Sequence, residues 1–398
     1  MAVPPVEFVL FASTLLGVAL FHDRTLEVAA TGLAAIIAYK LALADFDGLP
    51  GFAGLAHHFR SEQVGLANLF CLLMGFALLS RHFEESRVPA RLPDFLPDDW
   101  RGGFVLLLLV FVLSSFLDNI AAALIGGTVA ATVYRHKVHV GYLAAIVAAS
   151  NAGGSGSVVG DTTTTMMWIS GVSPLAVVHA YVAAVVALLV FGVPASLQQQ
   201  RHSPIMRRAS ERVRVDWVRL GVVGVILAVA VATNVTINVA FPSLATRFPF
   251  IGASVWAALI VTAPLRVPDW KVLRPTLRGT AFLLCLVFAA TLMPVEALPS
   301  PSWHAALGLG FVSAVFDNIP LTKLALEQGG YDWGMLAYAV GFGGSMIWFG
   351  SSAGVAITNA YPEARSVGLW LRSGWHVALG YVAGFVALLI TLGWQPHS

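Results

Sequence analysis

One polar pattern, Ser-x-x-x-Asp-Asn-Ile, occurs once in each half of the chain, starting at Ser114 and at Ser313. Carboxylate, amide and hydroxyl oxygens are hard ligands that suit hard cations. A carboxylate that is desolvated or close to another carboxylate also takes up protons more readily. The pattern therefore indicates a site for a small cation or a proton. Its polar residues are Ser114, Asp118, Asn119, Ser313, Asp317 and Asn318.

Both copies lie inside long apolar segments. A charged residue at the centre of a membrane helix costs about 2.5–3.5 kcal/mol on insertion scales, so such residues usually have a function or a partner. Because the two aspartates occupy matching contexts in the two halves, they suggest a transport site between internal repeats. Each serine stands four residues before its aspartate, which would place a hydroxyl and a carboxylate on one helix face.

A second repeated pattern, Gly-Gly-Ser-x4-Gly, follows each copy and starts at Gly153 and at Gly343. Glycine disfavours helix, so we expect both helices to unwind here, with the first break continuing through the threonines 162–165. Unwound carbonyls coordinate sodium in broken transporter helices. Alternatively, these glycines only allow close helix packing. The polar residues near the breaks are Asn151, Asp161, Thr163, Thr164, Ser345, Ser351 and Ser352.

The charge of these segments bears on the ligand. Helix N-termini at the breaks could hold an anion. However, Asp118, Asp161 and Asp317 are expected to converge, and their negative field favours a cation or a proton.

Composition indicates the elements that must position these residues. Of 398 residues, 58% are hydrophobic and 11% are charged, against about 25% charged in soluble domains. This predicts an all-α polytopic membrane protein embedded in a lipid bilayer. The two cysteines lie in apolar segments and indicate neither a disulfide framework nor a cysteine metal site. A net charge of +2 gives no reason to expect a nucleic-acid partner.

About ten segments are apolar and long enough to be transmembrane helices. We expect the first of them to be a span rather than a removable signal, because no basic n-region and cleavage site accompany it. The spans are residues 6–21, 26–44, 64–80, 140–170, 175–196, 217–233, 250–265, 279–294, 335–357 and 374–394.

Residues 103–134 and 303–328 differ, because each consists of two apolar arms of about 15 residues around an Asp-Asn pair, and a crossing helix needs about 20. We predict two re-entrant helical hairpins with their tips at mid-membrane. The alternative is a pair of short, tilted spans at each position.

Most of the 23 lysines and arginines fall on one side when the spans alternate. The positive-inside rule makes that side cytoplasmic and both termini external. The two halves then have inverted topology. We predict a first repeat over 1–196 (hairpin 103–134, broken helix 140–170), a cytoplasmic linker over 197–216, and a second repeat over 217–398 (hairpin 303–328, broken helix 335–357).

Three further ionisable residues stand out. Lys323, in the second hairpin, occupies a cation position, pairs with Asp317, or extends its ammonium toward the external side of the membrane. The pair His57 and His58, near Glu62, either senses pH or is an ordinary solvated pair.

Together these motifs resemble the ion-transporter superfamily, and most closely its NhaD-type sodium/proton antiporters. The matching residues of the first half are Ser114, Asp118, Asn119, Asn151, Asp161, Thr163 and Thr164. Those of the second half are Ser313, Asn318, Ser351 and Ser352. Citrate and dicarboxylate carriers of the superfamily typically have Ser-Asn-Thr at both hairpin tips, whereas this chain has Asp-Asn. Lys323 departs from what we expect of sodium antiporters.

The resemblance implies a secondary active transporter that exchanges sodium or lithium for protons by an elevator-type mechanism. It also implies a homodimer in the plasma membrane, with no cofactor beyond the transported Na⁺ and H⁺. An enzyme is not expected, since no nucleophile and base stand at a catalytic spacing. The alternative is a cation-coupled carrier of citrate or another carboxylate or oxyanion. The expected sodium ligands are Asp118, Asn151, Asp161, Thr163 and Thr164.

Overall fold

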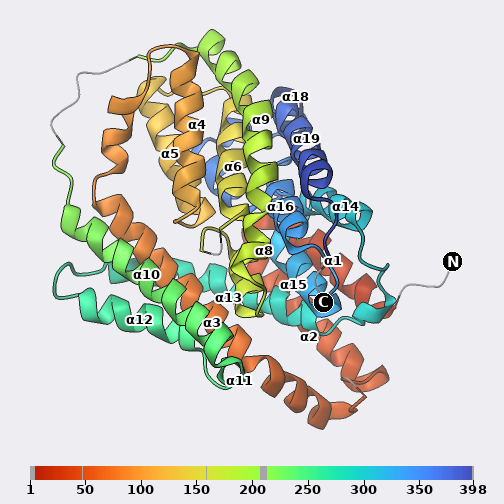
Figure 1. The fold of residues 1–398 in the computed structure, drawn as a ribbon. Coiled ribbons are helices and arrows are strands. Elements are labelled where there is room, and N and C mark those ends of the chain that lie inside the picture. Colours follow the sequence, from red (N-terminus) through yellow and green to blue (C-terminus); the bar gives the residue numbers. More distant parts are fainter. Residues whose placement is uncertain (1–4, 47, 158, 207–212, 397–398) are drawn as a thin grey trace.

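The computed structural model describes residues 5–396 except 47, 158 and 207–212. Within these residues the regular structure is helical and includes no β-strand (Figure 1). Six of the described helices are long and apolar enough to cross a membrane, by length and composition. The prediction of an all-α fold is therefore confirmed, and the helices are those of a polytopic membrane protein.

Every segment predicted to be membrane-embedded contains helix. The helices of the first half are α1 (Val6–Leu20), α2 (Thr25–Leu43), α3 (Gly51–Glu85), α4 (Trp100–Ser114), α5 (Asn119–Val133), α6 (Val140–Ser155), α7 (Thr162–Ile169), α8 (Pro174–Val178) and α9 (Ala180–His202). Those of the second half are α10 (Trp217–Ala240), α11 (Pro242–Ala245), α12 (Phe250–Thr262), α13 (Leu273–Thr291), α14 (Trp303–Ser313), α15 (Asn318–Gln328), α16 (Trp333–Gly343), α17 (Ser352–Ala360), α18 (Val367–Ser373) and α19 (Trp375–Leu392).

Several helix boundaries differ from the prediction, among them the end of α10 at Ala240 and the start of α13 at Leu273. Two further differences change how a segment is interpreted. α3 begins at Gly51 rather than near residue 64, because its first turns are polar enough to escape a hydropathy criterion yet remain helical. α9 continues to His202, inside the predicted linker, where the buried Gln199 amide donates to the Lys137 carbonyl at 3.0 Å. The linker residues Arg207 and Arg208 lie outside the described residues.

The two predicted hairpins are helix pairs that turn at the Asp-Asn positions. Asp118 caps α5 by accepting the Ile120 N–H at 3.3 Å, with φ −52° and ψ 139°. Asp317 caps α15 by accepting the Ile319 N–H at 3.0 Å, with φ −54° and ψ 139°. Aspartate is a preferred N-cap because its carboxylate satisfies a free backbone N–H. Thus the two turns have the same local geometry.

The expected shared helix face of serine and aspartate is wrong. α4 ends at Ser114, and Asp118 lies beyond it in a non-helical conformation. The same holds in the second hairpin, where Ser313 ends α14 and its hydroxyl donates to the Val340 carbonyl at 2.8 Å. The aspartates prefer the cap position, and this ends the first helix before the i,i+4 relation can form.

Both predicted helix breaks are confirmed. The first separates α6 from α7 between Ser155 and Thr162, and the second separates α16 from α17 between Gly343 and Ser352. The four threonines, however, are helical and form the first turn of α7. Thr164 and Thr165 donate their hydroxyls to the Asp161 carbonyl at 2.9 and 2.8 Å, which stabilises this first turn.

The glycines of the breaks allow close contact with the hairpins. A Cβ atom on Gly153 would collide with the Phe111 carbonyl of α4, and one on Gly343 would collide with the Gly310 carbonyl of α14. Both carbonyls stand seven residues before the capping aspartate of their hairpin. Close packing and unwinding, posed as alternatives for these glycines, therefore both occur.

We expect Gly153→Ala to lower the free energy of unfolding by about 1–3 kcal/mol, the usual cost of overpacking a dense interior. Gly308→Ala in α14 is the matched control, because a Cβ atom there meets nothing within 4 Å. Thermal unfolding of the two purified variants checks this expectation. Equal midpoints for both variants would contradict the contact at Gly153.

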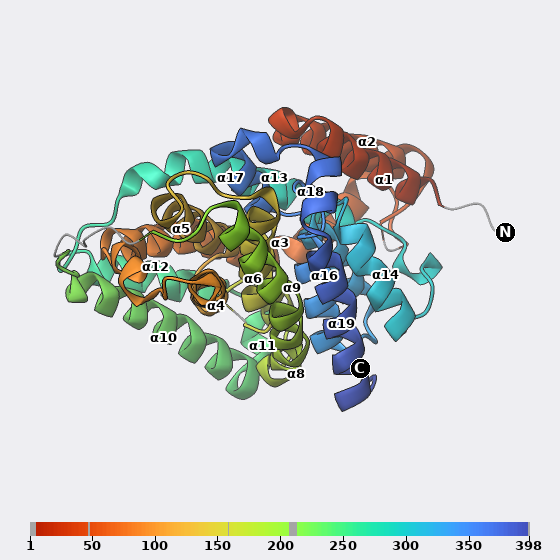
Figure 2. The same ribbon diagram turned by 90° about the horizontal axis from the view of Figure 1, so that it is seen from above.

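The helices pack as two groups, each built from both halves of the chain. We call α1–α3 with α10, α12 and α13 the frame group, and α4–α9 with α14–α19 the core group. Figures 1 and 2 show α10, α12 and α3 together along one flank, while α6, α9, α16 and α19 pack against one another. The two groups meet mainly where α15 packs on α13 and where α7 packs on α3.

Candidate functional site

A buried hydrogen-bond network connects the first hairpin to the first break. The Asn119 Nδ2 group donates to Asn151 Oδ1 at 3.0 Å and to Asp161 Oδ1 at 3.3 Å. All three side chains are at least nine-tenths buried. α5 positions Asn119 directly after its capping aspartate, so the hairpin tip is fixed against both sides of the break.

The same network reaches the second half of the chain. Asn151 donates its amide to Ser345 Oγ at 2.9 Å and to Ser351 Oγ at 3.1 Å. Both serines belong to the second break, and Ser351 also caps α17 by accepting the Gly354 N–H at 3.3 Å. Asn151 therefore joins the two breaks, and its hydrogen bonds occupy both ends of its amide.

Three buried oxygens close to Asp161 in the sequence or the fold form no hydrogen bond with any residue that the structure describes: Asp161 Oδ2, Thr163 Oγ1 and Ser114 Oγ. Asp161 is 3% exposed and Ser114 is fully buried. Buried polar atoms almost always have a partner, so an unpaired one marks a position for water, an ion or a proton. The absence of a side chain on Gly341 keeps the space open, because a Cβ atom there would lie 3.2 Å from Asp161 Oδ2.

Asp118 and Asp161 line the same space. A small cavity of about 20 Å³ lies between them, bordered also by Thr162 and Thr165. This is room for about one water-sized particle. A larger cavity of about 440 Å³ is lined by both aspartates and extends to Glu84 and Thr276.

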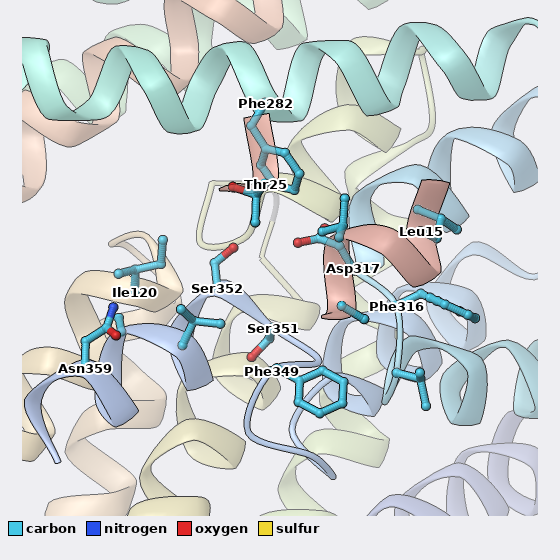
Figure 3. Close-up of a pocket in the computed structure, with 15 residues that line it drawn as sticks. Leu15, Thr25, Ile120, Phe282, Phe316, Asp317, Phe349, Ser351, Ser352 and Asn359 are labelled. Atoms are coloured by element: carbon cyan, nitrogen blue, oxygen red, sulfur yellow. The ribbon is translucent and has the colours of Figure 1, made fainter. Parts of the chain in front are cut away.

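Asp317 lies in a neighbouring cavity of about 280 Å³. Figure 3 shows the side chains of Thr25, Ser352 and Asp317 pointing toward one space. Ile120, Phe282 and Ser352 line both large cavities, so the two are adjacent. The expected convergence of three carboxylates thus takes the form of two in one cavity and the third next to it.

The remaining predicted site residues have different local roles. The Thr164 and Ser313 hydroxyls donate to backbone carbonyls, at Asp161 and Val340. Thr163 is fully buried beside Asp161, and Asn318 lines the 440 Å³ cavity. The residues predicted as sodium ligands therefore lie close together. However, the Asn151 side chain is hydrogen-bonded to Asn119, Ser345 and Ser351. The Thr164 hydroxyl stabilises the first turn of α7.

Several cavity residues were not anticipated from the sequence. They belong to helices of the frame group. Their polar residues form no repeated motif in the sequence, so nothing there indicates a binding site. These residues are Thr25, Ser80, Glu84, Thr276 and Thr280.

The suggested pairing of Lys323 with Asp317 is wrong. The Lys323 ammonium binds Glu62 Oε2 at 2.9 Å and Glu327 Oε1 at 2.5 Å. Lys323 follows Asp317 along α15, and its side chain extends to α3 and along its own helix instead. His58, close to Glu62 on α3, is buried with its Nε2 3.0 Å from Thr291 Oγ1. A pH-sensing role for His57 and His58 stays a prediction.

Apolar helices of membrane-spanning length thus surround a buried network that contains a carboxylate. Residues 7–343 match the family described as citrate transporter (CitMHS), and the chain belongs to this family. It is a family of transporters, not of enzymes, as predicted.

Curated relatives carry a different name. Sodium/proton antiporter 1 of Arabidopsis thaliana is 28% identical over 337 residues, which cover 73% of this chain and 55% of that protein. Sodium/proton antiporter 2 of the same plant is 27% identical over 73% of this chain and 76% of its own length. The Na(+)/H(+) antiporter NhaD of Halomonas elongata is 34% identical over 94 residues, 23% of this chain and 19% of that protein. The chain spans about half the length of the first of these relatives. The predicted resemblance to the NhaD type is confirmed.

Proposed function

We propose that the protein exchanges sodium or lithium for protons at a site formed by Asp118 and Asp161. In this proposal the two carboxylates bind the cation in one part of the cycle and take up protons in the other. The observation that carries the proposal is Asp161: one carboxylate oxygen accepts from Asn119, and the other is buried without a protein partner. Asp118 shares the small cavity with it. Two carboxylates in a low-dielectric space attract a cation strongly, and they accept a proton when the cation leaves.

A cation-coupled carrier of citrate or another carboxylate is the second candidate. The family description and a cavity of about 440 Å³, a volume typical of small-molecule sites, favour it. Charge opposes it, because a substrate carboxylate about 5 Å from Asp118 would cost about 3 kcal/mol at an effective dielectric constant of 20. The names of the relatives also support the antiporter.

The proposed mechanism moves the core group against the frame group. The division of the helices supports an elevator-type cycle, since the aspartates belong to the core group and line cavities bordered by frame helices. In this proposal the halves 1–196 and 217–398 are inverted repeats joined by the linker 197–216, and the hairpins are re-entrant. We place the arginine-rich side in the cytoplasm, both termini outside, and the protein as a homodimer in the plasma membrane.

Reconstitution tests the proposal. A sodium gradient imposed on proteoliposomes should drive proton movement in the opposite direction, read from a trapped pH dye. Labelled citrate should not accumulate in the same vesicles. Citrate uptake without any sodium-driven proton flux would replace the antiporter with the second candidate.

A further inference from the structure

A charged cluster lies at the contact between the two helical groups, outside the carboxylate network. The Lys323 ammonium of α15 is held by Glu62 of α3 and by Glu327, one turn further along α15. The Lys323 and Glu62 side chains are only 14% and 21% exposed. A charge desolvated to this extent needs its partner, and the loss of one partner leaves the other uncompensated.

This pair differs from the other ion pairs in where it lies. Among the ion pairs formed between described residues, Glu62–Lys323 joins the frame group to the core group, and the others remain within one group or one local turn. For example, Arg278 binds Glu27 at 2.6 Å, and both residues belong to the frame group. A displacement of the core group that moves α15 away from α3 must therefore break the contact between Lys323 and Glu62.

The pair also lies away from the opening of the ion cavity. The 440 Å³ cavity extends to Glu84 and Thr276, near the ends of α3 and α13 that carry Arg81 and Arg274. Glu62 precedes Glu84 on α3 by about 33 Å at the helical rise of 1.5 Å per residue. The cavity thus opens toward one end of α3 while the ion pair closes the contact nearer the other end.

We propose that the Glu62–Lys323 pair is a state-dependent latch, which holds the second hairpin against the frame group in this conformation and opens once in each transport cycle. The proposal rests on the proposed function in that it requires the core group to move. Glu327 has a defined part in it. Because Glu327 shares the helix of Lys323, it keeps the ammonium paired when Glu62 separates, so the open latch does not leave a buried lysine without a counter-charge.

Covalent closure of the latch tests it first. In a Cys71→Ser/Cys285→Ser background, Glu62→Cys and Lys323→Cys are joined by a short bifunctional thiol reagent. Cross-linking should reduce flux to the level of protein-free vesicles, and each single cysteine variant should be unaffected by the reagent. Glu27→Cys with Arg278→Cys is the matched control, because that pair lies within the frame group; its cross-link should leave flux unchanged. Full flux with the Glu62–Lys323 positions verifiably cross-linked overturns the latch.

A second readout needs no transported ion. Thr276→Cys, in the wall of the large cavity, is labelled with a membrane-impermeant maleimide from the arginine-rich side. Lys323→Gln should slow this labelling about fivefold, the lower end of typical couplings between protein sites, by releasing the observed conformation. The matched control Arg278→Gln should leave the rate unchanged. An unchanged rate with Lys323→Gln overturns the latch. If the Cys71→Ser/Cys285→Ser protein itself shows no sodium-driven proton flux, the proposed function is contradicted and the latch is still tested by the labelling rate.

Discussion

Asp161→Asn is expected to abolish sodium-driven proton flux while leaving the protein folded. The asparagine side chain has the same shape and can still accept the hydrogen bond that Asn119 now donates at 3.3 Å. It cannot take up a proton or carry the negative charge that holds a cation at the unpaired Oδ2 position. The measurement is flux in proteoliposomes together with the unfolding midpoint in detergent. We expect background flux and a midpoint within a few degrees of the parent.

Asp332→Asn is the matched control, because Asp332 is also a buried aspartate, 4% exposed, in the second half of the chain. Its two oxygens accept the Met335 N–H at 3.0 Å and the Gln395 N–H at 2.9 Å, so both are used structurally. The change should cost about 1 kcal/mol of stability, the usual worth of one hydrogen bond, and should preserve flux. If Asp161→Asn transports at the parental rate, Asp161 is a structural residue like Asp332.

Asp118→Asn has the second largest expected effect. The variant separates the two roles of Asp118, which are to cap α5 and to carry a negative charge in the cavity. Asparagine is as good an N-cap as aspartate, so the bond to the Ile120 N–H is kept and α5 still begins at residue 119. Only the charge in the cavity shared with Asp161 is lost. Flux should fall to background without a change in stability.

Asp118→Ala completes the comparison. It removes the cap as well as the charge, and loss of a cap costs about 1 kcal/mol. We expect both variants to lose flux and the alanine variant alone to unfold at a lower temperature. Normal flux in Asp118→Asn, combined with a destabilised Asp118→Ala, would make Asp118 a helix cap and nothing more.

Local sequence patterns predicted the elements of this fold well, because each has a local physical cause. The breaks begin directly after Ser155 and Gly343, within the two Gly-Gly-Ser patterns, because glycine disfavours helix. Gly153 and Gly343 also permit contact with a hairpin carbonyl. The hairpins turn at Asp118 and Asp317, which are N-caps. An N-cap residue is not inside the preceding helix, so these aspartates do not share a helix face with Ser114 and Ser313.

Contacts between residues far apart in the chain could not be predicted from the sequence. Lys323 and Glu62 are separated by 261 positions, and their contact depends on how the frame and core groups pack together. Glu327, by contrast, stands four residues after Lys323, a spacing that pairs charges on one helix. The polar residues of the cavity wall, such as Thr276 and Thr280, stand alone in apolar helices, so only the packed structure shows which of them face the aspartates.

Proton release on sodium binding tests the central claim most directly. The purified protein is placed in weakly buffered solution with a pH indicator, and sodium chloride is added, with choline chloride as the control. If Asp118 and Asp161 exchange a proton for a cation, sodium and lithium should acidify the solution in proportion to protein, and choline should not. Asp161→Asn should release none. Binding of sodium by the parent without any proton release would contradict exchange at these carboxylates.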